Sequence, residues 1–235
     1  MSRETCYRCF RPARLCWCGE LVPMDTRTRF VLLMHPKEFK REKANTGRLT
    51  HLCLANSEII VDAAFETNAT LRERLADETY HSALLYPGET ACDLSDGQSL
   101  PPALATRPLQ IFILDATWSS ARKMLRLSPV LQALPRLMFR ATAPSRYRIK
   151  QQPQEGCLST LESVHELLLV LERRGLDEYA RPGQLVDAFT RMQDFQMECA
   201  ANPDLGGYRR APYKETGARK KLVGQSAQRR RYIKL

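Results

Sequence analysis

The sequence predicts an α/β fold in which helices cover a mainly parallel sheet. Short apolar runs of strand length, at residues 30–34, 59–61, 82–86, 109–114 and 137–139, alternate with segments of helical periodicity. Runs this apolar are typical of strands buried on both faces of a parallel sheet. The 235 residues are enough for one such domain with a sizeable core and a small additional module.

The helices between these runs are predicted from periodicity and from their ends. Ser159-Thr160-Leu161-Glu162 has the pattern of a capping box, in which Ser159 and Glu162 exchange hydrogen bonds with each other's backbone amides. Apolar residues then recur at helical spacing until Arg173-Arg174-Gly175, a favourable helix end. Further helices are expected over residues 47–55, 69–78, 119–127 and 182–200.

The most informative strand is residues 109–114, because it ends in Asp115-Ala116-Thr117-Trp118. In open α/β sheets, ligands bind in the crevice at the carboxyl ends of the strands. Asp115 and Thr117 could instead cap the helix that follows. The strand end is therefore a candidate site, with helix capping as the alternative.

Two other loops are candidates for the same crevice. Tyr86-Pro87-Gly88-Glu89 offers a tight turn with accessible backbone, and residues 155–160 lead into a helix N-terminus whose free amides suit a carboxylate. The sequence has no Gly-x-Gly-x-x-Gly or Walker-type loop. We therefore expect neither a nucleoside triphosphate nor a dinucleotide of the Rossmann type.

Four cysteines lie close together near the N-terminus: Cys6, Cys9, Cys16 and Cys18. Two close pairs separated by a short loop suit tetrahedral zinc, and four thiolates leave no open position, so the role would be structural. Without a secretory signal, disulfides are disfavoured. An iron–sulfur cluster uses the same four thiolate ligands and remains the alternative to zinc.

The formal net charge of +10 is concentrated at the C-terminus. Residues 208–235 contain ten Lys or Arg against one acidic residue, Glu215, whereas residues 1–207 have a net charge of +1. A nearly neutral body with a cationic tail suggests a nucleic-acid partner; the alternative is a solvated tail that aids solubility. We expect three parts: a zinc module with four cysteine ligands (1–25), a catalytic domain (26–207) and the basic tail (208–235).

Several basic residues flank the predicted crevice and could contact a phosphate backbone on either side of it. They are Lys37, Lys40, Arg41, Lys43, Arg48, Arg146, Arg148 and Lys150. No apolar run has the length of a membrane span, and no signal peptide is evident. We expect a cytoplasmic monomer without an obligate protein partner.

Six pieces of the chain, in order, resemble one family: the DTW-domain proteins, and among them the bacterial tRNA-uridine aminocarboxypropyltransferases. The pieces are Cys6/Cys9/Cys16/Cys18, His35-Pro36-Lys37-Glu38, Asn45-Thr46-Gly47-Arg48-Leu49, Tyr86-Pro87-Gly88, Asp115-Ala116-Thr117-Trp118, and Glu155-Gly156-Cys157-Leu158-Ser159-Thr160-Leu161-Glu162. They cover residues 6 to about 200, and the basic tail lies outside them.

The resemblance implies a fold related to the knotted SPOUT superfamily and S-adenosylmethionine as a substrate. Its 3-amino-3-carboxypropyl group would be transferred to N3 of a tRNA uridine, expected at variable-loop position 47, with release of methylthioadenosine. Asp115, Thr117 and Trp118 would be the catalytic residues, with Asp115 either the general base or the group that holds the donor. The donor would be bound by Leu85, Tyr86, Pro87, Gly88, Leu114, Asp115, Thr117, Trp118, Cys157, Leu158, Ser159 and Thr160.

Two other functions remain to be separated from this one. An RNA methyltransferase on the same scaffold would use the same donor but release S-adenosylhomocysteine. A non-catalytic zinc-containing RNA-binding protein would bind RNA with a strong salt dependence and would have no affinity for the donor.

Overall fold

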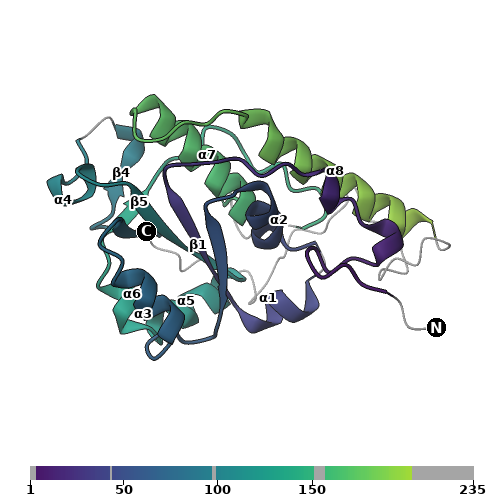
Figure 1. Cartoon of the computed structure of the whole chain (residues 1–235), viewed down its shortest axis with the longest axis horizontal. Helices are drawn as coiled ribbons and strands as arrows, with labels where there is room; N and C mark the ends of the chain where they lie inside the picture. Colours follow the sequence, from purple (N-terminus) through teal and green to yellow (C-terminus); the bar gives the residue numbers. More distant parts are fainter. Residues whose placement is uncertain (1–3, 43, 97–98, 151–156, 203–235) are drawn as a thin grey trace, which may run out of the picture.

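A six-stranded parallel sheet forms the centre of the protein in a computed structural model that describes residues 4–42, 44–96, 99–150 and 157–202 (Figure 1). The strand order is β2-β1-β5-β3-β6-β4, and each of the five neighbouring pairs is parallel. The strands are β1 (Arg29–Met34), β2 (Ser57–Val61), β3 (His81–Leu85), β4 (Cys92–Asp93), β5 (Leu109–Asp115) and β6 (Arg136–Met138). The parallel α/β architecture predicted from the sequence is confirmed.

Helices cover both faces of this sheet (Figure 1). On one face lie α2 (Thr46–Cys53), α7 (Thr160–Arg173) and α8 (Pro182–Ala201), and on the other lie α3 (Ala69–Leu75), α5 (Trp118–Arg126) and α6 (Pro129–Gln132). Each face of the sheet has its own hydrophobic core. β1 contributes side chains to both cores, because alternate strand residues point to opposite faces. Phe30 and Leu32 join the core under α2 and α7, whereas Val31 and Leu33 join the core under α5.

The ends of α7 explain why this helix is the clearest in the sequence. Ser159 and Glu162 form the predicted capping box at its start. At its end, Gly175 has a φ of 68°, and the amides of Gly175 and Leu176 donate to the carbonyls of Glu172 and Leu171. This is the Schellman arrangement, which needs a left-handed residue after the helix and therefore favours glycine.

The N-terminal segment packs against the helices of one face. It contains two short 3₁₀ helices (Ala13–Leu15 and Cys18–Glu20), and Trp17 and Met24 belong to the same core as α7 and α8. Met24 also forms a bridge with Leu54 at the end of α2. The cysteine segment is therefore joined to the domain through a shared core.

Several short elements differ from the sequence prediction. α1 (Pro36–Arg41) occupies the start of what reads as a charged loop, because Pro36 suits the first helical turn and His35 Nδ1 accepts a hydrogen bond from the Lys37 amide. The short helix α4 (Pro102–Ala105), α6 and the two-residue strand β4 were also not predicted. Helices and strands of two to six residues leave too little periodicity to read.

The remaining boundaries shift by at most two residues, except that α3 ends three residues earlier than predicted. In the part of the chain that the structure describes, no helix combines the length and apolarity needed to cross a bilayer. The basic tail, Lys43 and residues 151–156 lie outside the described residues.

Candidate functional site

A cleft of about 410 Å³ lies where the carboxyl ends of β3, β5 and β6 meet the first turns of α5 and α7. Its lining is mainly apolar, with a few polar groups, as in most small-molecule sites. The lining residues are Leu85, Tyr86, Pro87, Ile113, Leu114, Ala116, Trp118, Ala121, Leu137, Met138, Phe139, Arg140, Ala141, Cys157, Leu158, Thr160 and Ser163. The cleft is at the edge of the sheet where ligands are expected.

Most of the predicted donor-binding residues meet in this cleft. Those that line it are Leu85, Tyr86, Pro87, Leu114, Trp118, Cys157, Leu158 and Thr160. The sequence prediction missed residues 137–141, at the end of β6. The rule that drew attention to the end of β5 applies equally to β6 and would have found them.

Four predicted site residues do not line the cleft. Gly88 lies beside the Arg136 side chain, and Thr117 is exposed and caps α5 by accepting a hydrogen bond from the Ser120 amide. Ser159 is committed to the capping box of α7. Asp115 is 5 % exposed and lies behind the cleft wall.

Asp115 is held by side chains from two helices. Asn45 Nδ2 donates to its Oδ2 at 2.9 Å, and Thr160 Oγ1 donates to its Oδ1 at 2.7 Å. Asn45 is at the same time the N-cap of α2, since its Oδ1 accepts from the Arg48 amide at 2.6 Å. Asp115 therefore does not cap α5: its carboxylate joins the first turns of α2 and α7.

Burial dominates the electrostatics of this carboxyl group. It raises the pKa of Asp115, while the hydrogen bonds from Thr160 and Asn45 and the positive charges of Lys150 and Arg48 act in the opposite direction. Glu38 of α1 also has a raised pKa, caused first by burial. The negative charge of Asp115 adds to that rise, which places the two carboxyl groups in one electrostatic environment.

A second set of hydrogen bonds fixes the loop of residues 145–148. Glu162 accepts from the Arg146 amide at 2.6 Å and from Ser145 Oγ at 2.9 Å, in addition to its capping-box bond. From α8, Gln193 accepts from the Arg148 amide at 2.5 Å. Residues 145–148 are thus attached to both α7 and α8.

The basic residues predicted to contact RNA have different environments. Lys37, Lys40 and Arg146 are exposed, whereas Lys150 is paired with Glu42 at 2.9 Å and Arg148 with Asp194 at 2.7 Å. Arg48 departs most from the expectation, because its side chain is 4 % exposed. Lys43 lies outside the described residues, as does the side chain of Arg41.

The four N-terminal cysteines converge as predicted. The sulfur atoms of Cys6, Cys9, Cys16 and Cys18 all lie within 4.8 Å of one another, with separations of 3.6 Å (Cys6–Cys18), 3.5 Å (Cys9–Cys16) and 3.3 Å (Cys16–Cys18). A tetrahedral Zn²⁺ with Zn–S bonds of about 2.3 Å requires S–S separations of roughly 3.8 Å. The four thiols therefore fit a metal ion with only small adjustments.

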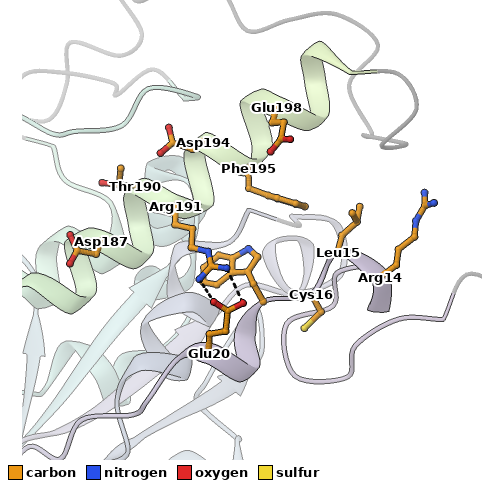
Figure 2. Close-up of a pocket in the computed structure, with 11 residues that line it drawn as sticks. Arg14, Leu15, Cys16, Glu20, Asp187, Thr190, Arg191, Asp194, Phe195 and Glu198 are labelled. Atoms are coloured by element: carbon orange, nitrogen blue, oxygen red, sulfur yellow. Dashed lines mark hydrogen bonds and ion pairs between the residues drawn. The ribbon is translucent and has the colours of Figure 1, made fainter.

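A larger hollow, of about 630 Å³, lies between this cysteine segment and α8 (Figure 2). Trp17 and Phe195 contribute its apolar surface, and Arg191 reaches across it to form two hydrogen bonds with Glu20, at 2.7 and 3.0 Å (Figure 2). Its acidic and basic groups are interspersed, and its lining comes from residues 14–20 and from α8, with none from a strand end. The smaller, apolar cleft is the better candidate for a ligand.

These features define a parallel α/β protein with a candidate ligand cleft at the strand ends and a four-thiol cluster that could hold a metal ion. The chain matches the family model of the DTW domain over residues 3–197 and belongs to this family. The resemblance seen in the sequence is thereby confirmed.

Curated relatives share the name tRNA-uridine aminocarboxypropyltransferase. The chain is 32 % identical to "tRNA-uridine aminocarboxypropyltransferase 2" of Drosophila melanogaster over 179 residues, which are 73 % of this chain and 68 % of the relative. It is 28 % identical to the protein of that name from Mus musculus over 193 residues (80 % and 63 %). It is 25 % identical to "tRNA-uridine aminocarboxypropyltransferase A" of Arabidopsis thaliana over 224 residues (83 % and 81 %).

The chain thus spans about two thirds of the length of these animal relatives. They are eukaryotic, so the bacterial subgroup suggested by the sequence is not borne out. No solved structure matches the chain significantly.

Proposed function

We propose that this protein transfers the 3-amino-3-carboxypropyl group of S-adenosylmethionine to N3 of a tRNA uridine, with variable-loop position 47 as the expected target. The observation that carries the proposal is the cleft at the ends of β3, β5 and β6, in a chain of the DTW family. The names of the curated relatives support the same activity.

The lining of the cleft suits the donor. Leu85, Pro87, Leu114 and Phe139 provide apolar surface for an adenosine, with Tyr86 and Trp118 available for contacts to flat rings. At the other end, Thr160 lies in the first turn of α7, where free backbone amides and the helix dipole favour the carboxylate of the amino-acid arm.

The reaction is a displacement at carbon. The uridine N3 forms a bond with the methylene carbon next to the sulfonium, the bond from that carbon to sulfur breaks, and the sulfur keeps the electron pair as neutral methylthioadenosine. The N3 proton leaves to a base. Since the sulfonium is already a good leaving group, the protein mainly has to present this carbon, and not the methyl group, to the nucleophile.

Asp115 and Thr160 together favour binding of the donor's amino group. Thr160 Oγ1 gives its only proton to Asp115, so the hydroxyl offers lone pairs to the cleft. An oxygen acceptor backed by a carboxylate suits an ammonium group. Of the two roles considered for Asp115, the occupied oxygens and the burial of the side chain support holding the donor over accepting the N3 proton.

The other parts of the proposal concern the metal and the RNA. Cys6, Cys9, Cys16 and Cys18 would hold a structural Zn²⁺, which with four thiolate ligands supplies folding energy and no catalysis. Exposed Lys37, Lys40 and Arg146 would contact tRNA phosphates. We retain the relation to the SPOUT superfamily as part of the proposal.

The test is nucleoside mass spectrometry of unmodified tRNA incubated with the protein and S-adenosylmethionine. We expect an aminocarboxypropyl adduct on uridine and methylthioadenosine in equal amounts. A methyl adduct with S-adenosylhomocysteine would replace the proposal with a methyltransferase. RNA binding with no affinity for the donor by calorimetry would replace it with a binding protein.

A further inference from the structure

One face of α2 joins the cysteine cluster to the rest of the protein. Leu52 packs with Cys9 and Cys18, and Arg48, one helical turn earlier on the same face, lies next to Phe10. Phe10 directly follows Cys9 and, among the described residues, is the one residue other than glycine with a positive φ, 57°. This backbone conformation helps to direct Phe10 over the Arg48 side chain.

Arg48 is a buried arginine, although arginine side chains are usually exposed. Its guanidinium carbon is 4.3 Å from the centre of the Phe10 ring and 5.1 Å from that of Phe39, and Nη2 donates to the Phe39 carbonyl at 2.8 Å. Its Nε is buried without a partner. Burying an arginine without a carboxylate in contact is costly, which makes a purely stabilising role a poor explanation.

The same residue is connected through its backbone to the cleft. The Arg48 amide donates to the Asn45 side chain, Asn45 donates to Asp115, and Asp115 accepts from Thr160, which lines the cleft. Burial lowers the pKa of Arg48, and the negative charge of Asp115 acts in the opposite direction. Arg48 therefore lies between the cysteine cluster and the buried carboxylate.

We propose that Arg48 is a positioning residue that couples the four-cysteine segment to the donor site: by clamping Phe10 and Phe39, it holds the first turn of α2, and with it Asn45 and Asp115, in place. The inference rests on the proposed function for its link to donor binding. α2 has only eight residues, too few to be stable without such contacts. When the clamp is lost, the first turn of α2 frays, and Asp115 loses the hydrogen bond from Asn45.

The test compares Arg48→Met with Arg29→Met, a matched control. Arg29 also stacks on an aromatic ring, that of Tyr80 at 4.0 Å, and it is paired with Asp77, but it lies at the opposite end of β1 from the cleft. We expect Arg48→Met to weaken S-adenosylmethionine binding at least tenfold by calorimetry. Arg29→Met should change the dissociation constant for S-adenosylmethionine less than twofold. It should nevertheless lower the melting temperature about as much as Arg48→Met does.

A double-mutant cycle with Phe10→Leu separates coupling from general loosening. Phe10→Leu keeps an apolar side chain and removes the aromatic face. We expect it to weaken donor binding in the wild-type background and to have little further effect in the Arg48→Met background. Additive effects of the two substitutions, or equal effects of Arg48→Met and Arg29→Met, would overturn the proposal.

Hydrogen exchange measured without the donor keeps the result independent of the proposed function. Arg48→Met should speed amide exchange in residues 45–53 and 159–163, and Arg29→Met should leave both segments protected. Unchanged exchange there in Arg48→Met would refute the coupling. A wild-type protein that binds no S-adenosylmethionine would refute the proposed function alone, because exchange would still report on the clamp.

Discussion

Gly47 lies directly against the carboxyl group of Asp115. A β-carbon at position 47 would fall 2.6 Å from Asp115 Cγ, well inside contact distance. Gly47 is in the first turn of α2, two residues after Asn45, which donates to the same carboxylate. The absence of a side chain at this position allows the helix N-terminus to approach Asp115 closely.

We predict that Gly47→Ala weakens donor binding at least tenfold. Alanine is the better helix former by about 1 kcal/mol, so helix propensity alone would stabilise the variant. The new methyl group must instead push Asp115 away or lift the first turn of α2. Calorimetric titration with S-adenosylmethionine measures the loss. Gly19→Ala is the control, because a β-carbon there meets no atom within 4 Å; equal affinity in the two variants would contradict the prediction.

Partly filling the cleft should weaken donor binding strongly while leaving the fold intact. Ser163 is half-buried at the end of the first turn of α7 and lines the cleft. We expect Ser163→Phe to reduce donor affinity more than tenfold, because the ring occupies part of a space of about 410 Å³. Circular dichroism should be unchanged. Ser119→Phe on α5, exposed and outside the lining, serves as the control. Undiminished affinity in Ser163→Phe would place the donor elsewhere.

The stability of the protein should depend on pH through Asp115 in a defined direction. Burial raises the pKa of Asp115 above its ordinary value of 3.8, so its contribution to stability is fully present below pH 3.8 and is lost as pH rises through the higher folded pKa. The free energy of unfolding of the wild type, minus that of Asp115→Asn, should therefore fall from pH 4 upward by up to about 1.4 kcal/mol for each pH unit of pKa difference.

Asp77 provides the opposite case, and urea titrations at a series of pH values measure the free energy of unfolding for both carboxyl groups. The hydrogen bond from Arg29 lowers the pKa of Asp77 to about 2, so its contribution is retained above pH 3.8 and lost only as the pH falls toward 2. The difference between the wild type and Asp77→Asn should not decline from pH 4 to 7. If the difference in free energy of unfolding between the wild type and Asp115→Asn instead rises from pH 4 to 7, the hydrogen bonds to Asp115 affect its pKa more than burial does.

Removal of the metal should destabilise the N-terminal segment first. We expect one Zn²⁺ per chain by elemental analysis, and a chelator or Cys9→Ser should lower the melting temperature by several degrees, because a structural metal site contributes directly to folding. Cys92→Ser is the control, since Cys92 lies in β4, outside the cluster. Iron with visible absorbance would identify an iron–sulfur cluster instead of zinc.

Local patterns predicted the main elements of the fold. Residues 109–114 read as a buried strand because every one is apolar except Gln110, and the strand is found with Asp115 as its last residue. The capping box at Ser159 and Glu162 and the glycine after α7 were also visible, because each depends on residues a few positions apart. α1 was not predicted, since six residues with charges on several sides carry no clear period.

For the site, the sequence by itself determined which residues lie at strand ends. Because parallel strands end at one edge of the sheet, this was enough to locate most of the residues that line the cleft. Only the tertiary structure decided what Asp115 does there. Asn45 and Thr160, which hold it, are 70 and 45 residues away along the chain. The burial of Arg48 between Phe10 and Phe39 was equally invisible, because an arginine's exposure depends on which distant side chains fold over it.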